Sequence, residues 1–283
     1  MEITLTTKRV QEIPVLTLAP AETQPKMQLP VIFFIPGYRN TKETGLSLGY
    51  RLARQGFFFL SFDPWLHGER YDRRLDAAHE PALGGIYPPD TGLDIGWVFY
   101  QVIQRCLEDV HTLLDELAKD VRLDLQRCGV TGPSMGGCAS YLVFAQLSQV
   151  RAAVAMIGIP TFARRWQDIL DESRYSNAAW AAALAQVSAQ TQAQTEFITR
   201  MDPYPRLKSA APKALLMMNN DFDTDQPKHY AIDAYRELLP FYRAHPDKLR
   251  LNIYPARHEV TPEMEQVAVG WFSQHLQPVP SMS

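Results

Sequence analysis

The stretch Gly132-Pro133-Ser134-Met135-Gly136 constrains the fold of this chain more than any other. An apolar, strand-like run ends just before it, and a run typical of a helix, 139–147, follows directly. This order predicts that the chain turns sharply at Ser134 and pushes the serine hydroxyl out above the edge of a sheet. Glycine is needed at 132 and 136, because strand and helix come too close there for a Cβ. An ordinary glycine-rich loop is the alternative, and the flanking strand and helix favour the sharp turn.

Composition limits the classes of protein to consider. The chain has 283 residues, a formal net charge of -3 and 46% hydrophobic residues. This suits one large α/β domain, 1–283, which buries enough surface to fold without a disulfide or a structural metal. A net charge near zero leaves no basic stripe for binding nucleic acid. The alternating charges of 69–76 are expected to face solvent.

Cysteine usage and the apolar runs indicate the compartment. Three cysteines, Cys106, Cys128 and Cys138, are too few and too irregularly spaced for a disulfide framework or a metal site. The first residues, 1–8, lack the basic-then-apolar pattern of a signal peptide, and no apolar run reaches membrane-spanning length. We therefore expect a cytoplasmic protein with reduced thiols and no membrane partner.

Short apolar runs alternate with segments of helical periodicity along most of the chain. Besides the strand before Ser134, apolar runs lie at 31–35, 57–62, 152–158, 213–218 and 249–255. Continuous runs of this kind are typical of strands buried on both faces of a parallel sheet. Residues 2–20 instead alternate, which favours an antiparallel hairpin with one wet face. The sequence thus predicts a doubly wound, mostly parallel sheet with an amino-terminal antiparallel hairpin.

Two segments interrupt the alternation. Residues 77–97 are rich in glycine and proline, and we expect this long loop to lie over the functional site. Residues 161–207 contain no strand candidate and carry aromatic residues on Ala/Gln-rich helical sequence. We interpret 161–207 as a helical cap inserted after a strand. The alternative is a set of surface helices that never meet a substrate.

A serine hydroxyl needs a nearby imidazole as base, and the imidazole needs a carboxylate to fix its tautomer. In a parallel sheet such groups gather at the carboxyl ends of the strands. Of the seven histidines, only His67 and His258 follow strands, and His258 lies between the last strand and the last helix. It is therefore the candidate base.

The candidate acids follow the strand that ends at 218. Asp221, Asp223 and Asp225 are all placed there, and the alternation of side chains cannot separate them, because all three could point the same way. We favour Asp223, with Asp221 as the alternative.

At this point the chain resembles the α/β-hydrolase superfamily, and within it the dienelactone-hydrolase and prolyl-oligopeptidase-like esterases. The order Ser134, Asp223, His258 is similar to that of the superfamily. Residues 217–227 resemble its strand followed by Gly-x-x-Asp-x-x-Val-Pro, with Asn220 and Gln226 in place of the usual Gly and Val. This resemblance implies that Asp223 is the acid. Residues 257–264 resemble the closing segment of small bacterial esterases of the group.

The resemblance also implies the remaining parts of a site. Pro36-Gly37-Tyr38 corresponds to the oxyanion loop, so the backbone N–H groups of Tyr38 and Met135 would stabilise a tetrahedral intermediate. The pattern Asp63…His67-Gly68…Arg70 is similar to the family's loop after the next strand, and either supports the site or forms a pocket wall. The residues proposed for a partly apolar pocket wall are Trp65, His67, Trp166 and Trp180.

The expected activity is hydrolysis of small carboxylic esters through an acyl-enzyme, with no metal and no organic cofactor. A peptidase of the prolyl-oligopeptidase-like type is one alternative, although no propeller-sized amino-terminal domain is present to sieve peptides. A non-catalytic ligand-binding protein of the same fold is another, because fold alone does not establish chemistry. The sequence predicts neither the acyl and alcohol groups accepted nor the oligomeric state.

Overall fold

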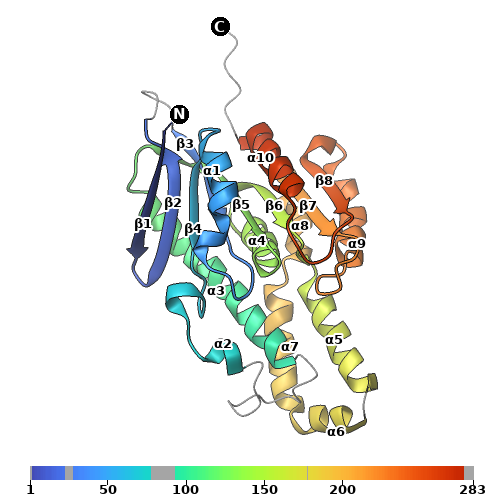
Figure 1. Cartoon of the computed structure of the whole chain (residues 1–283). Coiled ribbons are helices and arrows are strands. Elements are labelled where there is room, and N and C mark those ends of the chain that lie inside the picture. Colours follow the sequence, from blue (N-terminus) through green and yellow to red (C-terminus); the bar gives the residue numbers. More distant parts are fainter. Residues whose placement is uncertain (1, 23–27, 78–92, 177, 277–283) are drawn as a thin grey trace.

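An eight-stranded sheet forms the centre of the protein (Figure 1). The computed structural model describes residues 2–22, 28–77, 93–176 and 178–276. In spatial order the strands run β1-β2-β4-β3-β5-β6-β7-β8. Their bounds are β1 Ile3–Val10, β2 Ile13–Pro20, β3 Leu29–Phe34, β4 Phe58–Phe62, β5 Leu123–Pro133, β6 Val150–Met156, β7 Ala214–Asn220 and β8 Leu249–Tyr254.

All neighbouring strands from β4 to β8 pair in parallel, whereas β1 pairs with β2 and β2 with β4 in antiparallel fashion. β3, β4 and β7 are buried along their whole length, as their continuous apolar sequences predict. In the hairpin, β1 is largely exposed and β2 largely buried. The mostly parallel sheet and its amino-terminal antiparallel hairpin confirm the predicted fold class.

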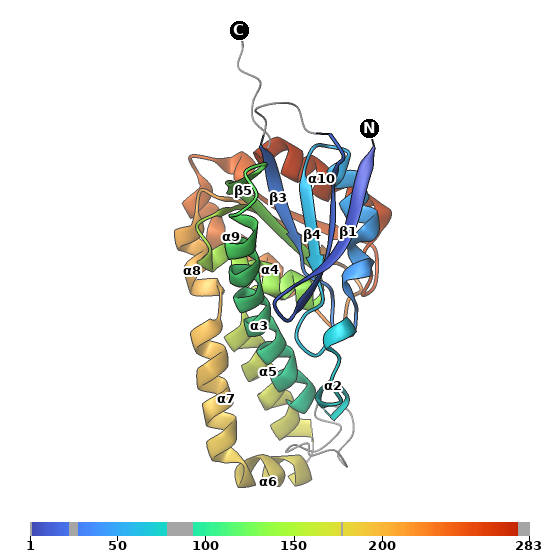
Figure 2. The ribbon, with the colours of Figure 1, turned by 90° about the vertical axis from the view of Figure 1, so that its left-hand side faces the viewer.

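Helices cover both faces of the sheet and enclose two apolar cores (Figures 1 and 2). On one face α1 and α10 pack over side chains of the central strands. Leu52 of α1 and Phe272 of α10 are fully buried in this core. On the other face the larger core contains α3 and α4. The helices are α1 Leu46–Ala53, α2 Arg74–Ala77, α3 Leu93–Leu117, α4 Met135–Gln146, α5 Phe162–Ser176, α6 Ala178–Gln186, α7 Ser188–Met201, α8 Tyr204–Ala210, α9 His229–Leu238 and α10 Pro262–Leu276. Short 3-10 helices are η1 Lys42–Gly45, η2 Gly68–Arg70, η5 Leu239–Tyr242 and η6 Pro246–Lys248.

The segment expected to form a helical cap, 161–207, folds into α5, α6, α7 and the start of α8. Figure 2 shows α5, α6 and α7 extending as an arm beyond one end of the sheet, beside the amino-terminal half of α3. The long glycine- and proline-rich loop expected over the site falls mostly at 78–92 and lies outside the described residues. No helix in the part of the chain that the structure describes is long and apolar enough to cross a membrane.

Asp202 joins the two ends of this arm. Its buried carboxylate accepts hydrogen bonds from the backbone N–H groups of Phe162 and Ala163, both at 3.2 Å, and from that of Tyr204 at 3.0 Å. The first two are unpaired amides of the first turn of α5, which a carboxylate stabilises well. Burial raises the pKa of Asp202, and the three N–H donors oppose that rise.

Candidate active site

Ser134 occupies the sharp turn that the sequence predicts. β5 ends at the preceding residue, α4 begins at the next, and Ser134 itself has φ 55° and ψ −114°. A non-glycine residue with this φ is strained, and such residues cluster at functional sites. A Cβ on Gly132 or Gly136 would lie 2.1 or 1.8 Å from the carbonyl oxygen of Ile35, so both positions require glycine.

His258 connects the serine to a carboxylate. Its Nε2 lies 2.9 Å from Ser134 Oγ and its Nδ1 lies 2.8 Å from Asp223 Oδ2. A neutral imidazole protonated on Nδ1 would donate to Asp223 and accept from the serine hydroxyl through Nε2. The structure thus brings together the three residues that the sequence selects from segments far apart in the chain.

Asp223 and Asp221 have different surroundings. The carboxylate of Asp223 is fully buried, and its other oxygen accepts the backbone N–H groups of Asp225 and Gln226 at 2.9 Å each. Asp221 has a side chain that is 43% exposed and pairs with the Lys228 ammonium. The imidazole therefore faces Asp223, whereas Asp221 forms a surface ion pair.

The electrostatics around His258 favour its protonated form. Burial lowers the pKa of His258, but the hydrogen bond and charge of Asp223, together with the charge of Asp225, outweigh burial and raise it above the ordinary histidine value. A raised pKa makes the neutral imidazole a stronger base.

Among the described residues, one group of side chains could hold a metal ion. It consists of Asp223, Asp225 and His258, whose possible ligand atoms lie within 4.8 Å of one another. Both oxygens of Asp223 already accept hydrogen bonds. These contacts orient the imidazole of His258.

The loop after β3 passes next to the turn at Ser134. A Cβ on Gly37 would lie 3.4 Å from the carbonyl oxygen of Pro133, and the backbone turns back where Asn40 N–H bonds Gly37 O at 3.0 Å. The ring of Tyr38 packs edge-on against His67, with centroids 5.4 Å apart. Burial raises the pKa of Tyr38 to about 12, so its hydroxyl stays protonated. Tyr38 and Met135, the expected oxyanion donors, thus belong to two adjoining segments that flank Ser134.

A buried ion pair, Lys42–Asp63, joins the loop after β4 to the loop after β3. Asp63 is fully buried and accepts the backbone N–H of Lys42 at 2.8 Å and the Lys42 ammonium at 3.0 Å. The same ammonium reaches Glu69 at 2.8 Å. Gly68 has φ +54°, and a Cβ there would lie 2.3 Å from the carboxyl carbon of Asp63. Asp63 thus joins Lys42 to the turn at Gly68, which favours the first of the two interpretations offered above, a support of the site.

Most charged side chains of 69–76 face solvent, as expected, and Arg70 is the exception. Arg70 has a side chain that is 16% exposed, and it donates to Asp109 at 2.6 Å. Arg74 and Arg105 lie over the ring of Trp65, with guanidinium carbons 5.2 and 5.8 Å from its centroid. The Arg70–Asp109 ion pair is largely buried and joins this segment to α3, whereas Arg74 and Arg105 stay exposed while they contact Trp65.

Two of the residues expected in a pocket wall are core residues in this structure. His67 is 1% exposed, with its Nδ1 bonded to the Trp65 carbonyl at 2.8 Å, and burial lowers its pKa. Trp166 is fully buried, and its Nε1–H donates to Thr195 at 2.9 Å between α5 and α7. The aromatic periodicity of α5 therefore reports helix packing. Trp180 lies in α6, and its side chain is outside the described residues.

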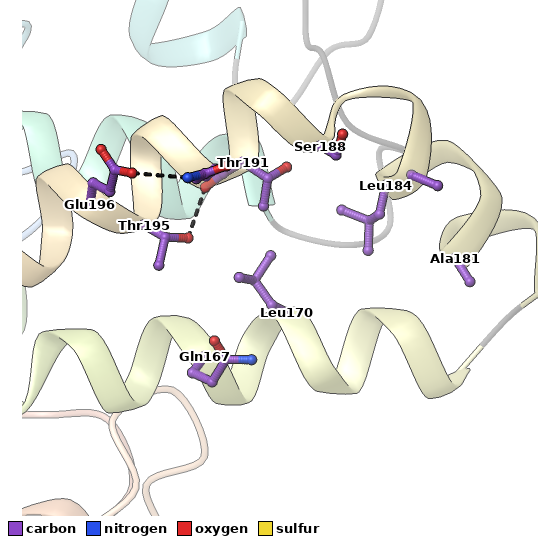
Figure 3. A pocket seen from close by; sticks show the side chains of 10 residues that line it. Gln167, Leu170, Ala181, Leu184, Ser188, Thr191, Thr195 and Glu196 are labelled. Carbon is purple, nitrogen blue, oxygen red and sulfur yellow. Dashed lines mark hydrogen bonds between the residues drawn. The ribbon is translucent and has the colours of Figure 1, made fainter.

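A groove of about 780 Å³ opens between α5 and the α6–α7 turn (Figure 3). Leu170 and Leu184 point into it from opposite sides, and Thr195 and Glu196 line it from α7. Its lining includes none of Ser134, Asp223 and His258. The groove is thus a feature of the helical arm and separate from the candidate site.

Sequence reasoning missed two buried polar side chains at the site. Lys42 gives no sequence signal, because an isolated lysine in a polar segment is expected at the surface. Asn220 does give a sequence signal, because it replaces the glycine of the motif that 217–227 resemble, but that signal alone does not predict a role. Its contacts are described below.

The sequence of this chain is similar to those of known proteins. The sequence model described as the prolyl oligopeptidase family matches residues 95–277. The chain is 25% identical over 169 residues to "Putative esterase YitV" of Bacillus subtilis (strain 168), and this match spans 60% of each protein. It is 23% identical to "Esterase YjfP" of Escherichia coli (strain K12), over 97% of this chain and all of that protein.

A solved structure shows the same fold. The acylaminoacyl peptidase of Pyrococcus horikoshii superposes with a TM-score of 0.67 at 15% identity, covering 100% of this chain and 43% of that one. Together with the family match, this likeness confirms the α/β-hydrolase fold and the resemblance to prolyl-oligopeptidase-like proteins.

Proposed function

The chain belongs to the prolyl oligopeptidase family and is a serine hydrolase, and from that premise we propose that it cleaves small carboxylic esters with Ser134, His258 and Asp223 as its catalytic triad. The observation that carries this proposal is the continuous hydrogen-bonded line from Ser134 Oγ through His258 to Asp223, with spacings of 2.9 and 2.8 Å. A serine at a strained turn and an oriented base are two of the requirements for acyl transfer from an ester.

In the first step His258 Nε2 removes the hydroxyl proton of Ser134 while Oγ attacks the ester carbonyl. Asp223 holds the imidazole in the Nδ1–H tautomer and stabilises the imidazolium that forms. The imidazolium then returns its proton to the alkoxide leaving group, the ester C–O bond breaks, and the alcohol departs. The acyl group stays on Ser134 as an ester.

The negative oxygen of the tetrahedral intermediate needs preorganised donors. We assign this role to the backbone N–H groups of Tyr38 and Met135, because they lie in the two segments that flank Ser134. The Lys42–Asp63 ion pair, fastened at 3.0 Å, holds the Tyr38 loop in place. Loss of one oxyanion donor commonly lowers kcat by about 10²–10³.

In the second step water takes the place of the alcohol. His258 removes a proton from the water as it attacks the acyl carbonyl, and the imidazolium then protonates Ser134 Oγ as the acid is released. The protein's own residues supply every proton transfer in this scheme. Neither a metal ion nor an organic cofactor has a role in it.

The names of the relatives favour esters over peptides. The two curated relatives carry the word esterase in their names. The chain spans only 43% of the length of the acylaminoacyl peptidase that it superposes on. Peptide hydrolysis is the second candidate, because that peptidase shares the fold. A third is ligand binding without turnover, which the complete triad disfavours.

The decisive experiment measures hydrolysis of p-nitrophenyl acetate and p-nitrophenyl butyrate by the wild type and by Ser134→Ala and His258→Ala. We expect turnover in the wild type and its loss in both variants, with melting temperatures retained. Peptidyl p-nitroanilides are measured in parallel. Faster turnover of the anilides would favour the peptidase, and binding without any turnover would favour a non-catalytic protein.

A further inference from the structure

We propose that Asn220 is a positioning residue for His258, holding the backbone on both sides of the imidazole. The inference rests on the proposed function of His258 as the catalytic base. Asn220 is the last residue of β7 and is fully buried. Its side-chain amide donates to the carbonyl oxygens of Arg257 and Glu259, the latter at 2.8 Å. The two residues that accept these bonds are the immediate neighbours of His258.

The end of β7 organises the whole segment that carries the histidine. Backbone N–H groups of Asp221 and Phe222 donate to the carbonyls of residues 254 and 256, at 2.8 and 3.0 Å. These backbone hydrogen bonds reach no further than residue 256. Among the described residues, the Asn220 side-chain amide donates to the carbonyl oxygens of 257 and 259. Three residues after Asn220, Asp223 binds the imidazole. One short segment therefore holds both the backbone and the ring of His258.

The chemistry of the amide suits this role. An amide NH₂ has two N–H donors, which matches the two carbonyls flanking His258. A glycine, which the resembling family motif carries at this place, has no side chain with which to donate. In this chain the loop would then lose both bonds.

A comparison with the neighbouring Asn219 separates positioning from simple packing. The Oδ1 atoms of Asn219 and Asn220 are both buried without a hydrogen-bond partner in the described part of the chain, so both side chains carry a desolvation cost that an apolar residue would avoid. The adjacent Asn219 is equally buried and donates to the Gly158 carbonyl at 3.1 Å, away from the histidine loop. Asn219 is thus a matched control of the same type, burial and strand end.

Catalysis depends on keeping His258 Nε2 at 2.9 Å from Ser134 and Nδ1 at 2.8 Å from Asp223. A misplacement of about 1 Å can lower the rate about 10²-fold. If the Asn220 amide is removed, the loop relaxes and both spacings lengthen. We then expect kcat to fall while KM changes little, because the misplaced base affects proton transfer more than substrate binding.

The contact with Asp223 also sets the basicity of the imidazole. Because that hydrogen bond and charge raise the pKa of His258, loosening them lets the pKa fall toward the ordinary histidine value. The neutral base is then present down to a lower pH. The acid limb of kcat/KM against pH should move to lower pH in Asn220→Ala, an effect that a general loss of stability does not produce.

The test measures kcat, KM, the pH profile and the melting temperature for Asn220→Ala, Asn220→Asp and Asn220→Ser, with Asn219→Ala as control. We expect about a 10- to 100-fold loss of kcat for Asn220→Ala. Asn220→Asp should lose more, since it sets a carboxylate against two carbonyl oxygens. Asn220→Ser, which keeps one donor, should lose less and serves if the alanine variant does not fold. Asn219→Ala should keep the wild-type pH midpoint.

Retention of kcat within about threefold in Asn220→Ala, or equal losses in Asn220→Ala and Asn219→Ala with an unmoved acid limb, would overturn the proposal. Nuclear magnetic resonance titration of the His258 imidazole in the wild type and Asn220→Ala needs no turnover. If the wild type hydrolyses no ester but the His258 pKa still falls in the variant, the esterase proposal fails and the positioning role stands.

Discussion

Replacing Asp223 with asparagine tests the triad at its least accessible member. Asparagine has the same shape, and its amide oxygen can still accept the backbone N–H groups of Asp225 and Gln226, which lie 2.9 Å from the present carboxylate. The amide NH₂ group then faces His258 Nδ1 in place of Oδ2. An NH₂ group is a donor, so Nδ1 must become an acceptor and the imidazole proton must move to Nε2.

This change removes the base from Ser134, because a protonated Nε2 cannot take the hydroxyl proton. In a serine protease triad the same substitution lowers kcat by about 10⁴ through the wrong tautomer. At about 1.4 kcal/mol for each power of ten, the loss is about 5 kcal/mol of transition-state stabilisation. The fold should persist, since the two backbone contacts of Asp223 survive.

The assay compares kcat for p-nitrophenyl butyrate in the wild type, Asp223→Asn and Asp221→Asn, with melting temperatures as a check on folding. Asp221 is the control, because its half-exposed side chain pairs with Lys228, and exposed pairs contribute little. We expect Asp221→Asn to stay within about twofold of the wild type. If Asp223→Asn keeps more than a tenth of wild-type kcat while Asp221→Asn loses its activity, the assignment of the acid is wrong.

Three further predictions concern the loops and the base. Gly68→Ala forces a Cβ to within 2.3 Å of the Asp63 carboxyl carbon at a φ of +54°, and should lower the free energy of unfolding by about 3 kcal/mol in urea titrations; a loss below about 1 kcal/mol would mean that the loop rearranges freely. Lys42→Met leaves the buried Asp63 carboxylate without its cation and should lower the same free energy by about 3–5 kcal/mol; an unchanged urea midpoint would contradict the structural role of this pair. Because the pKa of His258 is raised and only its neutral form is a base, kcat/KM should rise with pH through a midpoint above 6.5 and be lost as pH falls below it; a midpoint below 6.5 would show that burial outweighs Asp223.

Much of the fold could be predicted from local sequence. The continuous apolar runs that became β3, β4 and β7 are long enough to fill a strand and apolar enough to be buried on both faces. The sharp turn at Ser134 was predictable because glycines stand at the two positions where the Ile35 carbonyl excludes a Cβ. Local pattern and three-dimensional crowding agree at these places.

The contacts between distant loops could not be predicted in this way. Lys42 looks like a surface residue, and its burial depends on Asp63 and Glu69, 21 and 27 positions away. Trp166 has the spacing of a pocket residue and that of a core residue alike, and only the packing of α5 against α3 and α7 separates them. The choice between Asp221 and Asp223 depends on which one faces His258, which strand alternation does not specify. The catalytic roles of Ser134, Asp223 and His258 stay a prediction until turnover is measured.

The Asp202 carboxylate has a consequence for how this protein could be varied. Because it binds backbone N–H groups at both the entry and the exit of the α5–α7 excursion, the two junctions lie side by side, about the width of one side chain apart. A replacement for the forty or so residues from 162 to 201 could therefore begin and end at neighbouring points, and it would have to keep the apolar residues, such as Trp166 and Ile198, that belong to the main core.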